Sequence, residues 1–116
     1  MNSTAFRYAA LATLAVSLSL PAAAKEPTPK EVAKMMGDCV YVVNVAESNG
    51  VTLGHSSEQW GEWLISYAEA NGIDAKKQVD AAKAKYRKRG KVLGADKALN
   101  DMIYNARECD KQVAGL

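Results

Sequence analysis

This sequence predicts an all-α fold: a small four-helix bundle or orthogonal helical array with one disulfide, preceded by a signal peptide. Apolar residues recur every three or four positions in four segments, cap residues stand at the segment ends, and both cysteines fall on apolar stripes. The chain has 116 residues, a length typical of one domain at most. We divide it into a signal peptide (1–24), a linker (25–27) and a helical domain (28–116).

The first 24 residues have the order of regions found in a secretory signal peptide. Arg7 gives the start a single positive charge, a mostly apolar run follows over 8–20, and small residues close the segment at 22–24. The run from 8 to 24 has 17 residues, whereas a membrane-spanning helix needs about 20. We therefore expect cleavage after Ala24, no stable membrane anchor, and a periplasmic or secreted mature protein.

The first predicted helix begins at a capping box. Thr28 is its expected N-cap, Pro29 occupies the first helical position and Glu31 the third. Val42 and Val45 lie off the main apolar stripe, which predicts a helix that is buried on more than one side. The stripe itself comprises Val32, Met35, Met36, Cys39, Val40, Val43 and Ala46.

The second predicted helix follows Ser56, which is the expected N-cap of a second capping box completed by Gln59. Asn49-Gly50 is expected to end the first helix, and Asn71-Gly72 to end the second, since glycine readily takes the left-handed conformation that follows a helix. The apolar face of the second helix consists of Trp60, Trp63, Leu64, Tyr67 and Ala68.

The third predicted helix starts after Asp74 and ends near Gly90, with a connector over 92–94. Its apolar stripe is narrow and consists of Ala75, Val79, Ala82 and Tyr86. The fourth helix is expected from about Ala95 to Val113, with an apolar face formed by Leu99, Met102, Ile103, Ala106, Cys109 and Val113. The short connections favour antiparallel neighbours.

Cys39 and Cys109 are the only two cysteines, and each lies on the apolar stripe of its helix. An even number of cysteines in an exported protein indicates a disulfide. We therefore expect a bridge inside the core between the first and last helices; free thiols or an intermolecular bridge are the alternative. Closing a loop of roughly 70 residues would contribute about 4 kcal/mol to stability.

No catalytic or metal-binding pattern is visible, so we expect no enzymatic activity, no cofactor and no metal. His55 is the only histidine, and its place in a glycine-containing loop favours a structural or exposed role. Glu58 and Glu62 are four residues apart, but the E-x-x-H partner of a metal site in a bundle is absent, which favours a solvated acidic face.

Positive charge is concentrated in the third helix. Residues 74–91 contain eight Lys or Arg and two Asp, a net charge of +6, whereas the rest of the chain from residue 25 contains six basic and eleven acidic residues, a net charge of −5. Such a dense group attracts anions, although a solvated helix face is the alternative. The candidate residues for binding an anion or an acidic partner are Lys83, Lys85, Arg87, Lys88, Arg89 and Lys91.

The second helix supplies a candidate aromatic anchor. Trp63 shares only part of the stripe formed by Trp60, Leu64 and Tyr67, so its side chain can lean outward. A partly exposed tryptophan is a natural contact for a partner protein or glycan, whereas filling of the core is the alternative.

These features predict an exported binding or interaction protein, such as an inhibitor, immunity protein, adaptor or chaperone. Its partner would be an envelope protein or an anionic envelope component, because the export signal disfavours nucleic acid. The alternative is a carrier that holds a small ligand or cofactor in an apolar cavity inside the bundle. The residues expected to line that cavity are Met36, Trp60, Tyr67 and Met102.

Overall fold

The computed structural model describes residues 26–115, so the expected signal peptide lies outside the described residues. The described chain forms four α-helices and no strand, which confirms the all-helical prediction. They are α2 (Pro29–Ser48), α3 (Ser57–Ala70), α4 (Ala75–Leu93) and α5 (Ala95–Gln112). None of the helices within 26–115 combines the length and apolar character needed to cross a bilayer.

The helix starts follow the cap residues in the sequence. At α2 the Thr28 amide donates to Glu31 Oε1 at 2.8 Å and the Glu31 amide donates to Thr28 Oγ1 at 3.1 Å, which completes the predicted capping box. At α3 the Ser56 hydroxyl accepts from the Gln59 amide at 3.1 Å, but no reciprocal bond from the Gln59 side chain forms. A carboxylate of α2 satisfies this helix end instead, because Glu47 accepts from both the hydroxyl and the amide of Ser57.

The third helix is longer than the sequence predicts. α4 continues through Gly90 to Leu93, so the expectation that it ends near Gly90 with a connector over 92–94 is wrong. Gly90 lies inside this helix opposite α5, and a Cβ atom at this position would make an ordinary van der Waals contact with the Cβ of Ala98 at 3.9 Å. Gly90 therefore does not interrupt the helix, and Gly94, with φ of 94°, alone makes the sharp turn between α4 and α5.

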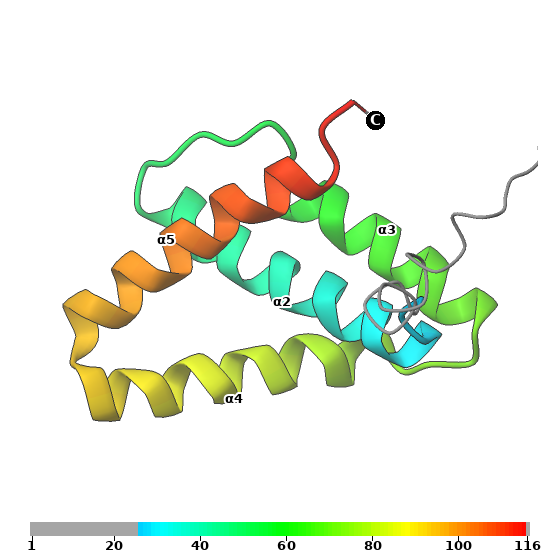
Figure 1. The fold of residues 1–116 in the computed structure, drawn as a ribbon, viewed down its shortest axis with the longest axis horizontal. Helices are drawn as coiled ribbons and strands as arrows, with labels where there is room; N and C mark the ends of the chain where they lie inside the picture. The colour runs from blue at the N-terminus through cyan, green and yellow to red at the C-terminus, as the bar shows by residue number, and fades with distance from the viewer. Residues whose placement is uncertain (1–25, 116) are drawn as a thin grey trace, which may run out of the picture.

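α2 is the central helix of the fold. It packs against each of the other three, whereas α4 also packs against α5 and touches α3 only slightly. Figure 1 shows α4 and α5 meeting at their junction and splaying apart on either side of α2. The off-stripe residue Val42 is fully buried, which confirms burial of this helix on more than one side. The main core consists of Cys39, Val42, Val43, Ala46, Trp60, Tyr86, Ala106 and Cys109.

The backbones of α2 and α4 approach most closely at Gly37. A Cβ atom there would lie 2.6 Å from the Cβ of Gln78 and 2.7 Å from its carbonyl carbon. Only glycine fits a contact of this kind without a shift of backbone. Gly37 therefore sets how near the basic helix lies to the central helix.

The predicted disulfide between Cys39 and Cys109 is confirmed. It links α2 to α5 with a Cα–Cα distance of 5.9 Å, within the usual range for such bridges. Both cysteines are buried, and neither is a free thiol. The bridge holds the central and last helices together.

Candidate binding surface and pocket

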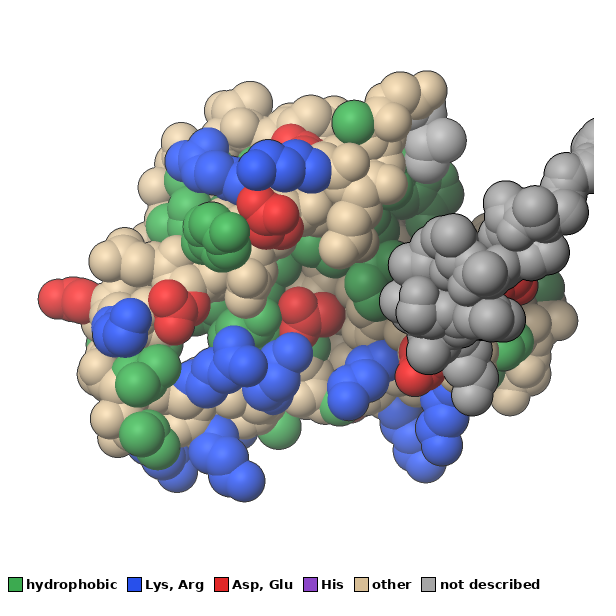
Figure 2. Space-filling model, in the orientation of Figure 1, with side chains coloured by type: hydrophobic (Ala, Val, Ile, Leu, Met, Phe, Trp, Pro, Cys, Tyr) green, Lys and Arg blue, Asp and Glu red, His purple; other side chains and the backbone are tan. Residues whose placement is uncertain are grey.

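The basic residues of α4 lie mostly on its exposed surface. Lys83, Arg87, Lys88, Arg89 and Lys91 are exposed, while Lys85 is half-buried against α2. The structure thus places five of the six candidate residues in solvent. In Figure 2 the Lys and Arg side chains gather along the lower part of the molecule, over α4, with carboxylates interspersed nearer α2.

Most of these cations have no partner within the described chain. Lys76 pairs with Asp80 at 2.7 Å, an exposed contact that raises the lysine pKa, and Lys85 pairs with Asp38 at 2.6 Å. No carboxylate of residues 26–115 lies within 4.0 Å of the other six, which are Lys77, Lys83, Arg87, Lys88, Arg89 and Lys91. The positive charge of α4 is therefore largely uncompensated.

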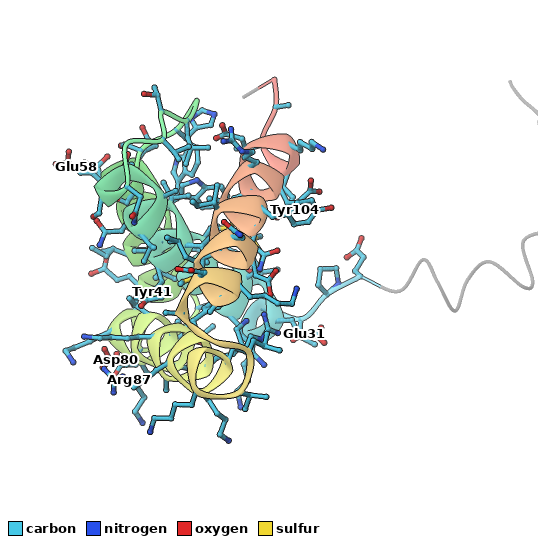
Figure 3. The ribbon with its side chains drawn as sticks, turned by 90° about the vertical axis from the view of Figure 1, so that its left-hand side faces the viewer. Glu31, Tyr41, Glu58, Asp80, Arg87 and Tyr104 are labelled. Carbon is cyan, nitrogen blue, oxygen red and sulfur yellow. A yellow bond between two sulfur atoms is a disulfide. The ribbon has the colours of Figure 1, made fainter. Side chains whose placement is uncertain are left out.

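Helical spacing divides these cations between two flanks of α4. Lys85 and Arg89 are one turn apart on the flank that faces α2 and α5, and both line a pocket there. Lys83 and Arg87 are also one turn apart, on the opposite flank. Figure 3 shows Arg87 pointing away from the molecule at the edge of α4, far from Glu31 on the pocket side.

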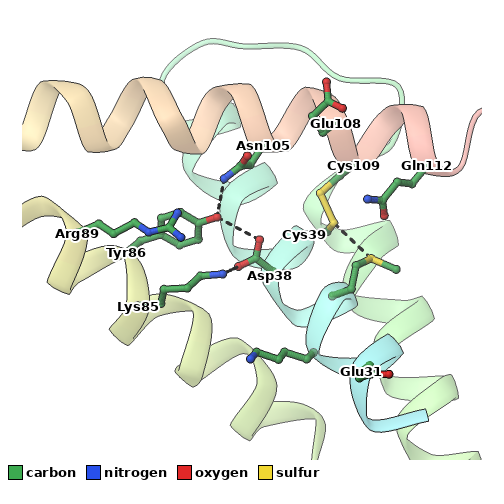
Figure 4. A pocket seen from close by; sticks show the side chains of 12 residues that line it. Glu31, Asp38, Cys39, Lys85, Tyr86, Arg89, Asn105, Glu108, Cys109 and Gln112 are labelled. Carbon is green, nitrogen blue, oxygen red and sulfur yellow. Dashed lines mark hydrogen bonds and ion pairs between the residues drawn. A yellow bond between two sulfur atoms is a disulfide. The ribbon is translucent and has the colours of Figure 1, made fainter. Parts of the chain in front are cut away.

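The pocket is a hollow of about 490 Å³ where α2, α4 and α5 meet. Figure 4 shows Lys85, Tyr86 and Arg89 reaching into it from α4, opposite Asn105 and Glu108 of α5. The disulfide forms part of its wall. Its lining residues are Glu31, Lys34, Met35, Asp38, Cys39, Lys85, Tyr86, Arg89, Asn105, Glu108, Cys109 and Gln112.

A polar network centred on Tyr86 ties the three helices together at this pocket. The Tyr86 hydroxyl donates to Asp38 Oδ2 at 3.2 Å and accepts from Asn105 Nδ2 at 2.7 Å. The Lys85 ammonium and the Arg89 guanidinium lie 4.8 Å and 5.1 Å from the centre of the Tyr86 ring. Burial of the phenol, followed by the negative charge of Asp38, raises the Tyr86 pKa above its ordinary value.

The sequence-based prediction missed Asp38 and Asn105 as members of this site. Asp38 carried a signal, since it lies four residues before Val42 and therefore shares the off-stripe face of the central helix. A lone carboxylate on that face predicts a polar partner from a neighbouring helix. Asn105 carried no comparable signal, because an isolated amide on a helix is ordinarily solvated.

Trp63 is half-buried in an aromatic cluster. Its ring lies 5.2 Å from the ring of Trp60, edge-on, and 5.1 Å from that of His55. His55 is half-buried, and its amide, like that of Gly54, donates to the Asp110 carboxylate of α5, which holds the loop in place. The exposure of Trp63 is therefore intermediate: its side chain is neither fully exposed, as a surface anchor would be, nor fully buried in the core.

An almost wholly apolar groove of about 420 Å³ runs beside this cluster. Its walls include three of the four residues expected for a carrier, Met36, Trp60 and Tyr67. The fourth, Met102, packs against the main core instead. The remaining lining residues are Met35, Trp63, Ser66 and Val113.

Metal-binding geometry is not found in the described part of the chain. No three His, Cys, Asp or Glu residues of 26–115 lie close enough together to hold an ion. Glu58 and Glu62 are both exposed on α3, and Figure 3 shows Glu58 pointing outward. These carboxylates therefore lie on a solvated face of α3.

The fold and its surface define a class: a small α-helical protein with one buried disulfide, a basic outer helix and a polar pocket beside it. No protein-family model, curated protein or solved structure matches this chain.

Proposed function

We propose that this protein is an exported binding protein whose basic helix α4 recognises the acidic surface of a partner protein in the cell envelope. The observation that carries the proposal is the row of exposed cations along α4 that have no carboxylate partner in the described chain. Uncompensated charge of one sign on a rigid helix steers and orients a partner of the opposite sign.

Export is part of the proposal. The order of charged, apolar and small residues in the first 24 positions supports a cleaved signal. The Cys39–Cys109 bridge is compatible with an oxidising compartment. Mass spectrometry of the protein from a periplasmic fraction tests this directly: the expected first residue is Lys25. A mature chain that begins at Met1 and stays with the cytosol contradicts export.

The binding surface is tested by capture from an envelope extract with two charge-matched variants. The first carries Lys83→Gln, Arg87→Gln and Lys88→Gln on the exposed side of α4. The second removes the same number of positive charges elsewhere, through three exposed residues: Lys30→Gln, Lys97→Gln and Arg107→Gln. The partner is then purified and its affinity for each variant is measured at several salt concentrations.

We expect the wild-type and control proteins to bind the partner alike, with affinity falling as ionic strength rises. The α4 variant should bind at least about tenfold more weakly, because three charges that face the partner are gone. Equal binding by both variants, or affinity that does not respond to salt, contradicts recognition through α4.

A second candidate function rests on the apolar groove. Met35, Met36, Trp60, Trp63 and Tyr67 form walls suited to an aliphatic or aromatic ligand, which supports the carrier alternative. Because the two tryptophans line the groove, a bound ligand should change their fluorescence. Saturable quenching by a medium-chain fatty acid that is lost in Met36→Gln supports this function; an unchanged spectrum contradicts it.

A further inference from the structure

The carboxylates of the pocket between α2, α4 and α5 already have partners. Glu31 accepts from the Thr28 amide at 2.8 Å, and Glu108 pairs with Lys111 at 3.0 Å. Asp38 is held by Lys85 on one oxygen and by the Tyr86 hydroxyl on the other. Each of these carboxylates therefore already has a hydrogen-bond or ion-pair partner within the protein.

Two cations of the same pocket are free. No carboxylate of residues 26–115 lies within 4.0 Å of Lys34 or Arg89, although both line the pocket. The Arg89 guanidinium rests 5.1 Å from the centre of the Tyr86 ring, which limits its freedom to turn away. A guanidinium held in this way offers paired donors to a planar anion.

We propose that this pocket binds an acidic peptide segment, with Arg89 and Lys34 as the two cationic contacts for its carboxylates. This inference rests on the proposed function, since it names the point at which the acidic partner is anchored. Asn105 and Gln112 border the same hollow and supply amide groups that hydrogen-bond a peptide.

The charge balance of the pocket favours a carboxylate over a phosphate. Its lining contains three basic residues, Lys34, Lys85 and Arg89, and three acidic residues, Glu31, Asp38 and Glu108. The lining is therefore neutral overall, so one bound carboxylate gives the occupied pocket a net charge of −1. A phosphate carries up to two negative charges close to the three carboxylates, which repel it.

A second hollow makes an extended peptide the better occupant than a small free acid. This hollow of about 190 Å³ lies along the seam of α2 and α4 and shares Lys34, Asp38 and Lys85 with the larger pocket. Its other walls are Gln78, Ala81 and Ala82. A peptide whose carboxylate side chain contacts Arg89 can extend along this seam. There the Gln78 amide can hydrogen-bond its backbone, and Ala81 and Ala82 can contact its apolar groups.

The test is a titration of the purified, isotope-labelled protein followed by NMR. The ligand is acetyl-Glu-Glu-amide, and the matched neutral ligand is acetyl-Gln-Gln-amide. We expect saturable shifts of the side-chain signals of Arg89, Asn105 and Gln112 with the acidic ligand only. Lys34→Gln with Arg89→Gln should weaken this binding about tenfold, whereas Lys97→Gln with Arg107→Gln, which removes the same charge from exposed positions outside the pocket, should change it less than about twofold.

Three results overturn the inference. The first is the absence of shifts at the pocket up to tens of millimolar ligand, and the second is equal weakening by both double variants. The third is tighter binding of inorganic phosphate than of the acidic dipeptide, which assigns the pocket to a phosphate group instead. Each of these three results concerns the pocket alone. The proposed function still stands if envelope capture depends on Lys83, Arg87 and Lys88, so failure of the pocket and failure of the proposed function can be told apart.

Discussion

The Tyr86 hydroxyl of α4 donates a hydrogen bond to Asp38 Oδ2 of α2 at 3.2 Å, across 48 positions of sequence. This contact joins the basic helix to the central helix at the edge of the pocket. Asn105 of α5 donates to the same hydroxyl at 2.7 Å, so one phenol connects three helices. The position of Arg89 over the ring depends on this arrangement.

Removing the Tyr86 hydroxyl should destabilise the fold. Tyr86→Phe keeps the ring but leaves Asp38 Oδ2 and the Asn105 side-chain amide each without its hydrogen-bond partner, which costs about 2 kcal/mol of unfolding free energy. Urea denaturation measures the loss. Tyr104→Phe is the matched control, because Tyr104 is 64% exposed and should change stability by less than about 0.5 kcal/mol. Equal effects of the two substitutions contradict the network.

The Tyr86 phenol should ionise at higher pH than an ordinary tyrosine. Burial and the charge of Asp38 raise its pKa above the usual 10.0, so folding favours the protonated form. The resulting stabilisation is fully present below pH 10 and is lost as the pH rises through the raised pKa. Absorbance at about 295 nm follows the ionisation of tyrosines as the pH is raised. The tyrosine ionisation that occurs at the highest pH should be missing in Tyr86→Phe. In Asp38→Asn the same ionisation should occur at lower pH, because the negative charge beside the phenol is gone.

Gly37 should tolerate no side chain. Gly37→Ala places a methyl group 2.6 Å from the Cβ of Gln78, so α2 and α4 must move apart at a cost of about 1–3 kcal/mol. Gly61→Ala in α3 is the control, since a Cβ there meets nothing within 4 Å, and it should stabilise the helix by up to about 1 kcal/mol. Thermal unfolding of both variants measures the difference, and a harmless Gly37→Ala contradicts the close contact.

Reduction of the disulfide should weaken the fold strongly. Cys39 and Cys109 are separated by 70 positions, and opening a loop of that length lowers the unfolding free energy by about 4 kcal/mol in the chain-entropy model. Urea unfolding with and without reductant gives this difference. A thiol reagent added to the unfolded, unreduced protein should find no free thiol. Two reactive thiols per chain before reduction contradict the bridge.

Several parts of the fold could be predicted from the sequence because they depend on neighbours along the chain. The capping box at Thr28 involves groups only three residues apart, and the Asp74 cap of α4 likewise accepts from the nearby Lys77 amide at 3.2 Å. The predicted end of the third helix near Gly90 is wrong, because a glycine by itself does not reveal whether a helix stops there; α4 continues through Gly90 to Leu93.

The candidate site likewise has one feature that the sequence predicts and another that depends on the packing of the helices. The concentration of cations in α4 is a property of the sequence, since it follows from counting residues in one segment. The sequence does not show which of them are neutralised: Lys85 is paired with Asp38 and Arg89 is left free, although they are one turn apart on the same helix. Lys85 is neutralised and Arg89 is not because α2 places the Asp38 carboxylate beside Lys85.

By itself the sequence determined the four helices of residues 26–115, the cysteine pair and the basic helix, because helical periodicity, caps and charge are local properties that need no partner. Only the tertiary structure decided the extension of α4 to Leu93 and the Tyr86 network. It also decided the division of the cations between a pocket and an open face. These features join residues far apart in the chain, so they exist only once α2, α4 and α5 are packed together.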